Sequence, residues 1–206
     1  MVFSASSTPP TPFLTAPFLK STQPKASPMS KKILVISGSP RKSANSETLC
    51  DRFVSGAREA GHYVEKFSLA GKQIAPCRAC YACRSGFCPQ QDGARGMIEK
   101  MLEADIIVLS TPVYFYTMCA QLKALIDRSV MVYPRIKNKA FYYIMTMADD
   151  DPANFKGTIE ALRGFVACCE GSTENGMLCV PGVYERGEIQ KHPEALQKAY
   201  ELGLHC

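Results

Sequence analysis

Residues 32–50 read KILVISGSPRKSANSETLC. Residues 33–36 form a short aliphatic run typical of a buried strand, and a helical pattern begins at Ser46 and ends before Gly61. Between them, residues 37–45 are mostly small, hydroxyl-bearing or basic, which predicts a loop. A buried strand, a loop of small residues and a helix start, in this order, indicate the first unit of a doubly wound α/β domain.

The same alternation of apolar runs and helical patterns continues along the chain. We expect strands over residues 63–67, 106–109, 141–145 and 177–180, and helices over residues 95–104, 154–168 and 192–204, with another helix ending near Ser129. Five strands joined by helices predict one parallel sheet in a three-layer α/β/α domain. The flavodoxin-like strand order 2-1-3-4-5 is the natural candidate, because right-handed crossovers leave few topologies. In that order the loops over residues 37–45 and 110–116 meet in one ligand crevice.

The first residues of the chain differ in composition from the rest. Up to Met29 there are six prolines, many hydroxyl residues and no acid, so we expect a disordered tail over residues 1–30 and one domain over residues 31–206. Prolines interrupt every apolar stretch that a secretory signal would need, which leaves a transit peptide or a translation start at Met29 as alternatives. The formal net charge of +5 is too small to indicate nucleic-acid binding, and no apolar run is long enough for a membrane span.

Cysteine is frequent, with 10 residues in the chain. Without an export signal this number indicates a reducing, cytoplasmic location, where clustered thiols point to metal or redox chemistry more than to disulfides. Four of the cysteines are spaced C-x2-C-x2-C-x4-C, namely Cys77, Cys80, Cys83 and Cys88. The first three have the spacing typical of [4Fe-4S] ligation, and Cys88 would have to close the same cluster because no second set exists. Structural zinc is a less natural alternative, since its cysteines usually come as two separated pairs.

The loop before the first helix has the composition of an anion site. Ser39, Ser43 and Ser46 offer hydroxyl groups, Asn45 an amide and Arg41 a guanidinium. The amino end of the helix adds unpaired N–H groups and a partial positive charge, so one monophosphate would be well satisfied. The loop matches neither the nucleoside triphosphate motif nor the usual dinucleotide fingerprint. The alternative is a capped loop without a ligand, in which Ser46 is the N-cap.

Three consecutive aromatic residues, 114–116, follow the third predicted strand. They cannot all point into one core, so some should be available to a flat ligand such as an isoalloxazine ring. The alternative is packing against a neighbouring loop or a second subunit. On the following helix, Lys123 and Asp127 form an i, i+4 pair, and Asp127 and Arg128 are expected to tie the helix end to nearby backbone.

Taken together, these motifs resemble those of NADPH-dependent FMN reductases and iron-sulfur flavoproteins of the flavodoxin-like superfamily. The resemblance is carried by residues 38–41 and 45–46, and by residues 111–116, 121–123 and 126–128, and it extends from Lys31 onward. It implies that the FMN phosphate is bound by Ser39, Arg41, Asn45 and Ser46, with Ser43 as a further hydroxyl of this loop. It also implies that the isoalloxazine is lined by Pro112, Val113, Tyr114 and Phe115, and that a third loop lies near residues 146–149.

The same resemblance implies an FMN-dependent NAD(P)H oxidoreductase. Electrons would pass from the nicotinamide through FMN, and through a [4Fe-4S] cluster if the four cysteines bind one, to a quinone, a flavin or a redox protein. Because the flavin carries the chemistry, no catalytic side chain is predicted. A non-enzymatic flavin or iron-sulfur electron carrier and a zinc-stabilised binding module are the alternatives. The flavin commonly lies near a subunit interface in this superfamily, so a homodimer or homotetramer is expected.

Residues 90–93 depart from the paired acids that often follow the fourth cysteine in the family.

Overall fold

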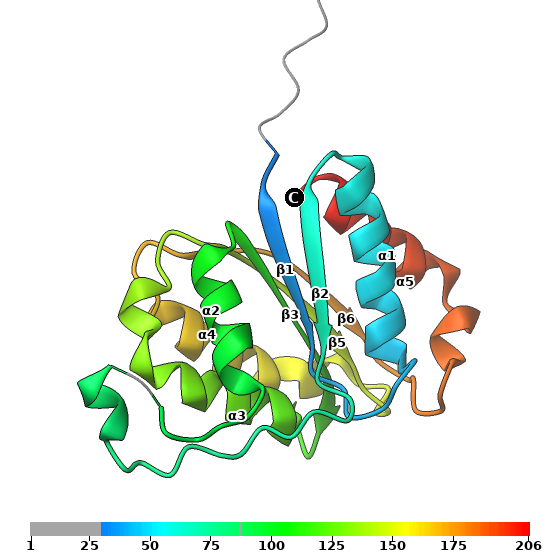
Figure 1. Cartoon of the computed structure of the whole chain (residues 1–206). Coiled ribbons are helices and arrows are strands. Elements are labelled where there is room, and N and C mark those ends of the chain that lie inside the picture. Colours follow the sequence, from blue (N-terminus) through cyan, green and yellow to red (C-terminus); the bar gives the residue numbers. More distant parts are fainter. Residues whose placement is uncertain (1–29, 87) are drawn as a thin grey trace, which may run out of the picture.

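The computed structural model describes residues 30–86 and 88–206 (Figure 1). The tail predicted over residues 1–30 lies outside the described residues, apart from Ser30. In chain order, the helices and strands are β1 (Lys32–Ser37), α1 (Asn45–Glu59), β2 (Tyr63–Ser68), α2 (Ala94–Glu103), β3 (Ile106–Tyr114), β4 (Thr117–Met118), α3 (Ala120–Arg128), β5 (Ala140–Thr146), α4 (Lys156–Ala167), β6 (Thr173–Val180) and α5 (Pro193–Leu204).

The sheet has the strand order β2-β1-β3-β5-β6, and all of these strands are parallel. The flavodoxin-like order 2-1-3-4-5 is therefore confirmed. The short strand β4 pairs antiparallel with the end of β3 and was not predicted. A strand of two residues leaves no periodic pattern in the sequence, because it is held by pairing with its neighbour and not by burial of one face.

Helices cover both faces of the sheet, with α1 and α5 on one face and α2, α3 and α4 on the other (Figure 1). Successive side chains of a strand point to opposite faces, so each strand contributes to two cores. Ile33 and Val35 of β1 pack in the core under α1 and α5, whereas Leu34 and Ile36 pack in the core on the opposite face. This arrangement explains why the central strands are continuous apolar runs and do not alternate with polar residues.

Two strand boundaries differ from those expected. Residues 110–116 do not form a loop, because β3 continues to Tyr114 and turns at the next two residues into β4. Ser110 and Thr111 stay paired with β5 in this extension, although their polar side chains gave no strand signal. The last strand begins at Thr173, four residues before the start expected from the apolar run. Both extensions are held by backbone pairing to a neighbouring strand.

The helices α1 and α5 approach each other through two glycines. A Cβ atom at Gly56 would lie 2.0 Å from the Tyr200 carbonyl oxygen, and one at Gly203 would lie 2.0 Å from the Phe53 carbonyl oxygen. Only residues without a side chain allow backbones to come so close. The contact joins the C-terminal helix firmly to the helix that starts at the predicted phosphate loop.

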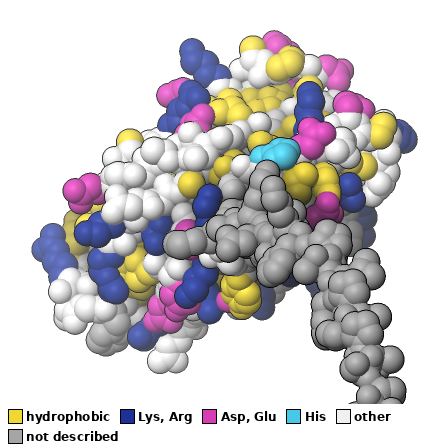
Figure 2. Space-filling view, turned by 90° about the horizontal axis from the view of Figure 1, so that it is seen from above, with side chains coloured by type: hydrophobic (Ala, Val, Ile, Leu, Met, Phe, Trp, Pro, Cys, Tyr) yellow, Lys and Arg dark blue, Asp and Glu magenta, His cyan; other side chains and the backbone are white. Residues whose placement is uncertain are grey.

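The end of the molecule where β1 begins has a mixed surface. Figure 2 shows Lys and Arg side chains intermingled with Asp and Glu side chains on this face, with hydrophobic side chains between them. Among the described helices, none has both the length and the apolar sequence needed to cross a membrane.

Candidate functional site

A cavity of about 670 Å³ opens at the carboxyl ends of the parallel strands. Sites for small molecules and cofactors typically have volumes of ~300–1,000 Å³. Its walls come from the segments that follow β1, β3, β5 and β6. The segments after β1 and β3 meet, as predicted, since the Gly38 N–H donates to the Ser110 carbonyl at 2.7 Å. A Cβ atom at Gly38 would lie 2.7 Å from that same oxygen, so glycine permits this approach.

Most of the predicted cofactor-binding residues line this one cavity, namely Ser39, Arg41, Asn45, Ser46, Pro112, Val113, Tyr114 and Phe115. Ser43 does not line it. Ser43 lies in a neighbouring polar hollow together with Lys42 and Glu47. Its backbone has a left-handed φ of 53°, and its N–H donates to Glu47 Oε2 at 2.6 Å. The expected third loop also reaches the cavity, because residues 146–148 line it.

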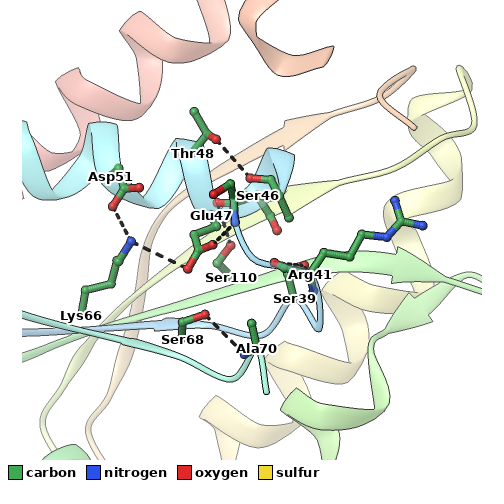
Figure 3. Close-up of polar contacts among 12 residues, drawn as sticks. Ser39, Arg41, Ser46, Glu47, Thr48, Asp51, Lys66, Ser68, Ala70 and Ser110 are labelled. Atoms are coloured by element: carbon green, nitrogen blue, oxygen red, sulfur yellow. Dashed lines mark hydrogen bonds and ion pairs between the residues drawn. The ribbon is translucent and has the colours of Figure 1, made fainter. Parts of the chain in front are cut away.

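The helix α1 begins without a side-chain cap. Ala44 occupies the N-cap position, so Ser46 is not the N-cap that the ligand-free alternative required. Ser46 is buried in the first turn (Figure 3). Its Oγ has no hydrogen-bond partner within the described part of the chain. The first N–H groups of any α-helix also lack acceptors within the helix. A buried hydroxyl and an uncapped helix start therefore form a site that suits an anion.

The negative charge of Glu47, the acidic residue of this first turn, is neutralised outside the cavity. Glu47 accepts from the Ser43 N–H, and its Oε1 lies 3.9 Å from Lys66 Nζ. Lys66 also forms an ion pair with Asp51. Figure 3 shows Lys66 and Asp51 on one side of the loop and Arg41 extending toward the other. The carboxylate therefore does not conflict with an anion bound beside Ser46.

The segment after β6 forms a wall of the cavity that the sequence did not predict, and it contributes Val183, Tyr184 and Arg186. Arg41 reaches this wall, where its Nη1 donates to the Tyr184 carbonyl at 3.4 Å and its guanidinium lies 6.0 Å from the Tyr184 ring centre. No motif or periodicity marks this segment. Only its place after the last strand of a doubly wound sheet could have suggested it.

Asn45 fixes the same wall to the start of α1. Its Nδ2 donates to the Glu185 carbonyl at 2.8 Å, and its Oδ1 accepts from the Ile189 N–H at 3.2 Å. Both polar ends of the amide are thus engaged by residues far along the chain. Asn45 therefore shapes the cavity by holding two of its walls together.

The tip of the β3–β4 hairpin carries aromatic side chains in a strained turn. Val113 pairs with Met118 and Tyr114 with Thr117, so Phe115 and Tyr116 form a two-residue turn. Their φ angles are 47° and 62°, a left-handed conformation that costs ~1–2 kcal/mol per residue outside glycine. Such turns favour Asn-Gly. Phe115 is nevertheless 99% exposed at the cavity mouth, which indicates a functional role for it.

The side chains that line the cavity have a one-sided charge. Arg41, Lys123 and Arg186 are basic, and no acidic side chain is among the lining residues. Lys123 pairs with Asp127 at 2.6 Å, as predicted. Burial raises the pKa of Tyr114 above its ordinary value, so its phenol stays a neutral hydrogen-bond donor at physiological pH. The cavity therefore suits a ligand with an anionic end and a flat, largely apolar body.

The four clustered cysteines lie on the connection between β2 and α2, which Figure 1 shows running beneath α2 and α3 to the outer edge of the molecule. Cys77 and Cys80 are exposed, and Cys83 and Cys88 are partly exposed. Within residues 30–86 and 88–206, no three His, Cys, Asp or Glu side chains converge as metal ligands would. The structure therefore does not bring the predicted ligands together, although four accessible thiols are a suitable donor set in chemical terms.

Fold and cavity together define a flavodoxin-like α/β protein with a cavity at its sheet switch point. Residues 31–168 match the model of the NADPH-dependent FMN reductase family. The chain belongs to this family.

Curated relatives are similar to part of the chain, and a solved structure shares its fold. The chain is 44% identical over 110 residues to the iron-sulfur flavoprotein of Methanosarcina thermophila, covering 53% of this chain and 56% of that protein. An iron-sulfur flavoprotein of Archaeoglobus fulgidus is 38% identical over 118 residues, covering 56% and 58%. The chain thus spans about half the length of the curated relatives it matches. The NAD(P)H:quinone oxidoreductase of Methanothermobacter marburgensis has the same fold, with a TM-score of 0.70 at 16% identity over 85% of this chain and 95% of that one.

Proposed function

We propose that this protein is an FMN-dependent NAD(P)H oxidoreductase that passes electrons from the nicotinamide through FMN to a quinone, a flavin or a redox protein. The observation that carries the proposal is the buried Ser46 hydroxyl, without a partner among the described residues, at the uncapped start of α1 on the cavity wall. Membership of the FMN reductase family supports the same reading.

The residues of the cavity suit FMN at both of its ends. The phosphate end is provided by Ser39, Ser46 and the first turn of α1, with the positive charge of Arg41 nearby. The ring end is provided by the apolar and aromatic residues 112–115 and by Met147. When bound, FMN supplies the acceptance of hydride and the release of electrons. The described residues supply position, positive charge and exclusion of water, and the reaction requires no acidic or basic side chain.

We also propose a [4Fe-4S] centre held by Cys77, Cys80, Cys83 and Cys88. Its support is the spacing of the thiols and the names of two similar curated relatives, both iron-sulfur flavoproteins. A cytoplasmic location remains part of the proposal, and it is supported by the ten cysteines, all of which are free. A homodimer or homotetramer is proposed as well. The exposed rings of Phe115 and Tyr116 support it, because large exposed aromatic side chains favour contact with another chain.

One experiment tests the central proposal. The full chain is purified without oxygen, its visible spectrum is recorded, and NADPH and NADH oxidation is then measured with a quinone, with free FMN and with ferredoxin. We expect bound flavin and steady turnover that depends on it. Flavin without turnover, together with rapid exchange with ferredoxin, would instead identify the protein as an electron carrier. Failure to bind added FMN would refute both readings.

A further inference from the structure

A single buried arginine closes the connection that carries the four cysteines. Arg128, the last residue of α3, is 3% exposed. Its Nη1 donates to the Ala75 carbonyl at 2.9 Å and to Asp92 Oδ2 at 2.7 Å. Its Nη2 donates to the Gln90 carbonyl at 3.3 Å and to Asp92 Oδ1 at 3.2 Å. One guanidinium therefore holds both ends of the segment 75–92, which we call the cysteine loop.

Asp92 completes this closure from the other side. Its Oδ2 accepts from the Ala75 N–H and its Oδ1 from the Ala94 N–H, both at 3.0 Å. Partial burial acts to raise the pKa of Asp92. The hydrogen bonds from Arg128 and from the two backbone N–H groups outweigh this effect and hold the pKa below its ordinary value. The ion pair is therefore intact at neutral pH.

The guanidinium has one donor left. Arg128 Nε is buried and has no hydrogen-bond partner among the described residues. Burial opposes the charge of Arg128, but Asp92 and, more weakly, the neighbouring Cys88 sulfur keep the pKa of Arg128 above its ordinary value. Arg128 therefore brings a fixed cation and one unused N–H to the closed ends of the loop, and groups of this kind are typical outer-shell partners of metal ligands.

Between its fixed ends, the described residues of the cysteine loop, 75–86 and 88–92, have little packing to lose. The 3-10 helix Ala82–Ser85 has no buried residue. Ala79 and Tyr81, on either side of Cys80, have left-handed φ angles of 50° and 58° although neither is glycine. The loop can therefore change its path around a metal centre at small cost to the core, while Arg128 keeps its ends in place.

We propose that Arg128 is a positioning residue for metal binding by the cysteine loop, where it fixes the loop ends and adds a buried positive charge beside them. The inference rests on the proposed iron-sulfur centre and adds to it a residue outside the cysteine motif. The helix α3 starts with Ala120, which lines the cavity, and ends with Arg128. One helix thus borders both proposed centres.

The test uses the full chain, reconstituted anaerobically with Fe²⁺ and sulfide. It compares the wild type with Arg128→Lys and with the control Arg163→Lys, which alters an exposed arginine of α4 that pairs with Glu174. Outer-shell changes typically weaken metal binding by about 10- to 100-fold, so a chelator should remove iron from Arg128→Lys at correspondingly lower concentration. The reduction potential of the centre should shift as well, because lysine cannot bind Asp92 with two parallel N–H groups and hold both loop ends. The control should match the wild type.

The outcomes separate this inference from the proposals on which it rests. Unchanged iron retention and potential in Arg128→Lys would refute the role of Arg128 and leave the iron-sulfur centre standing. If the wild type takes up no iron, the role of Arg128 and the iron-sulfur centre are both refuted. FMN binding is measured separately by titration. Cooperative thermal unfolding shows whether each variant is folded. If Arg128→Lys is not folded, Asp92→Asn keeps the arginine and loosens only the closure. Iron retention equal to the wild type in Asp92→Asn would then refute the inference.

Discussion

Ser46 places a hydroxyl group in the interior where no described residue pairs with it. Leaving such a group unsatisfied costs about 1–3 kcal/mol, and a hydrogen bond to a charged ligand contributes a similar amount. Ser46→Ala should therefore leave the stability of the ligand-free protein unchanged or slightly raised. It should weaken FMN binding by about 10- to 100-fold. Quenching of FMN fluorescence on titration measures the affinity, and urea unfolding measures the stability.

Ser43→Ala is the matched control for that measurement. Ser43 belongs to the same loop but lies outside the lining of the cavity. Its replacement should leave FMN affinity at the wild-type value. Equal losses in Ser43→Ala and Ser46→Ala would mean that the loop binds phosphate in a different arrangement from the one described.

Phe115 combines a strained backbone with an exposed ring. Asparagine adopts the left-handed conformation more readily, so Phe115→Asn should stabilise the ligand-free protein by up to about 1 kcal/mol. The same substitution removes a ring from the cavity mouth and should weaken FMN binding. Urea unfolding and FMN titration measure the two effects separately. A loss of stability would show that the Phe115 ring stabilises the turn by more than the backbone strain destabilises it.

At the scale of the elements, the contact between α1 and α5 depends on its glycines. Gly203→Ala places a Cβ atom against the Phe53 carbonyl, and overpacking of this kind costs about 1–3 kcal/mol. Gly164→Ala is the control, because Gly164 lies inside α4 with nothing near its added Cβ. It should stabilise the protein by about 0.5–1 kcal/mol. Urea unfolding measures the stability of both variants. If Gly203→Ala were more stable than Gly164→Ala, the packing argument would be contradicted.

The cysteine loop should become labile in acid. Because the folded-state pKa of Asp92 is lowered, its pair with Arg128 stabilises the fold above the ordinary value of 3.8. That stabilisation is lost as the pH falls through the lower folded-state pKa. Hydrogen exchange of residues 75–92 should accelerate in this acid range, before exchange of the sheet does. In Asp92→Asn, the amide hydrogens of residues 75–92 should exchange faster than in the wild type already at neutral pH. Equal protection in the variant and the wild type would contradict the claim that Asp92 and Arg128 close the loop.

At the scale of the whole molecule, alkaline pH should weaken the fold. Burial raises the pKa of Cys50 from 9.0 to about 12, so between these values the unfolded chain releases a proton that the folded protein keeps. Stability is therefore complete below 9.0 and falls as the pH rises toward 12. The urea midpoint should decrease over this range, and the decrease should be smaller in Cys50→Val. An equal decrease in both proteins would assign the effect to other groups.

The order of the strands was predictable because burial on both faces requires continuous apolar runs, such as residues 33–36. The meeting of the two loops then followed from topology alone. The contacts of single side chains were not predictable. Asn45 pairs with Glu185 and Ile189, partners that are 140 and 144 residues away, and no local sequence pattern indicates them. Cysteine spacing likewise indicates which residues can bind a metal, but it does not indicate whether their sulfurs converge before the metal arrives.

The wall formed by residues 183–186 lies beyond residues 31–168, the stretch that matches the family model. The part of the cavity wall that Arg41 and Asn45 contact is therefore encoded outside the stretch that defines the family. Substitutions in residues 183–186 can change the shape of this wall while every residue of the family match stays the same. Divergence among members of this family should therefore begin on this side of the cavity.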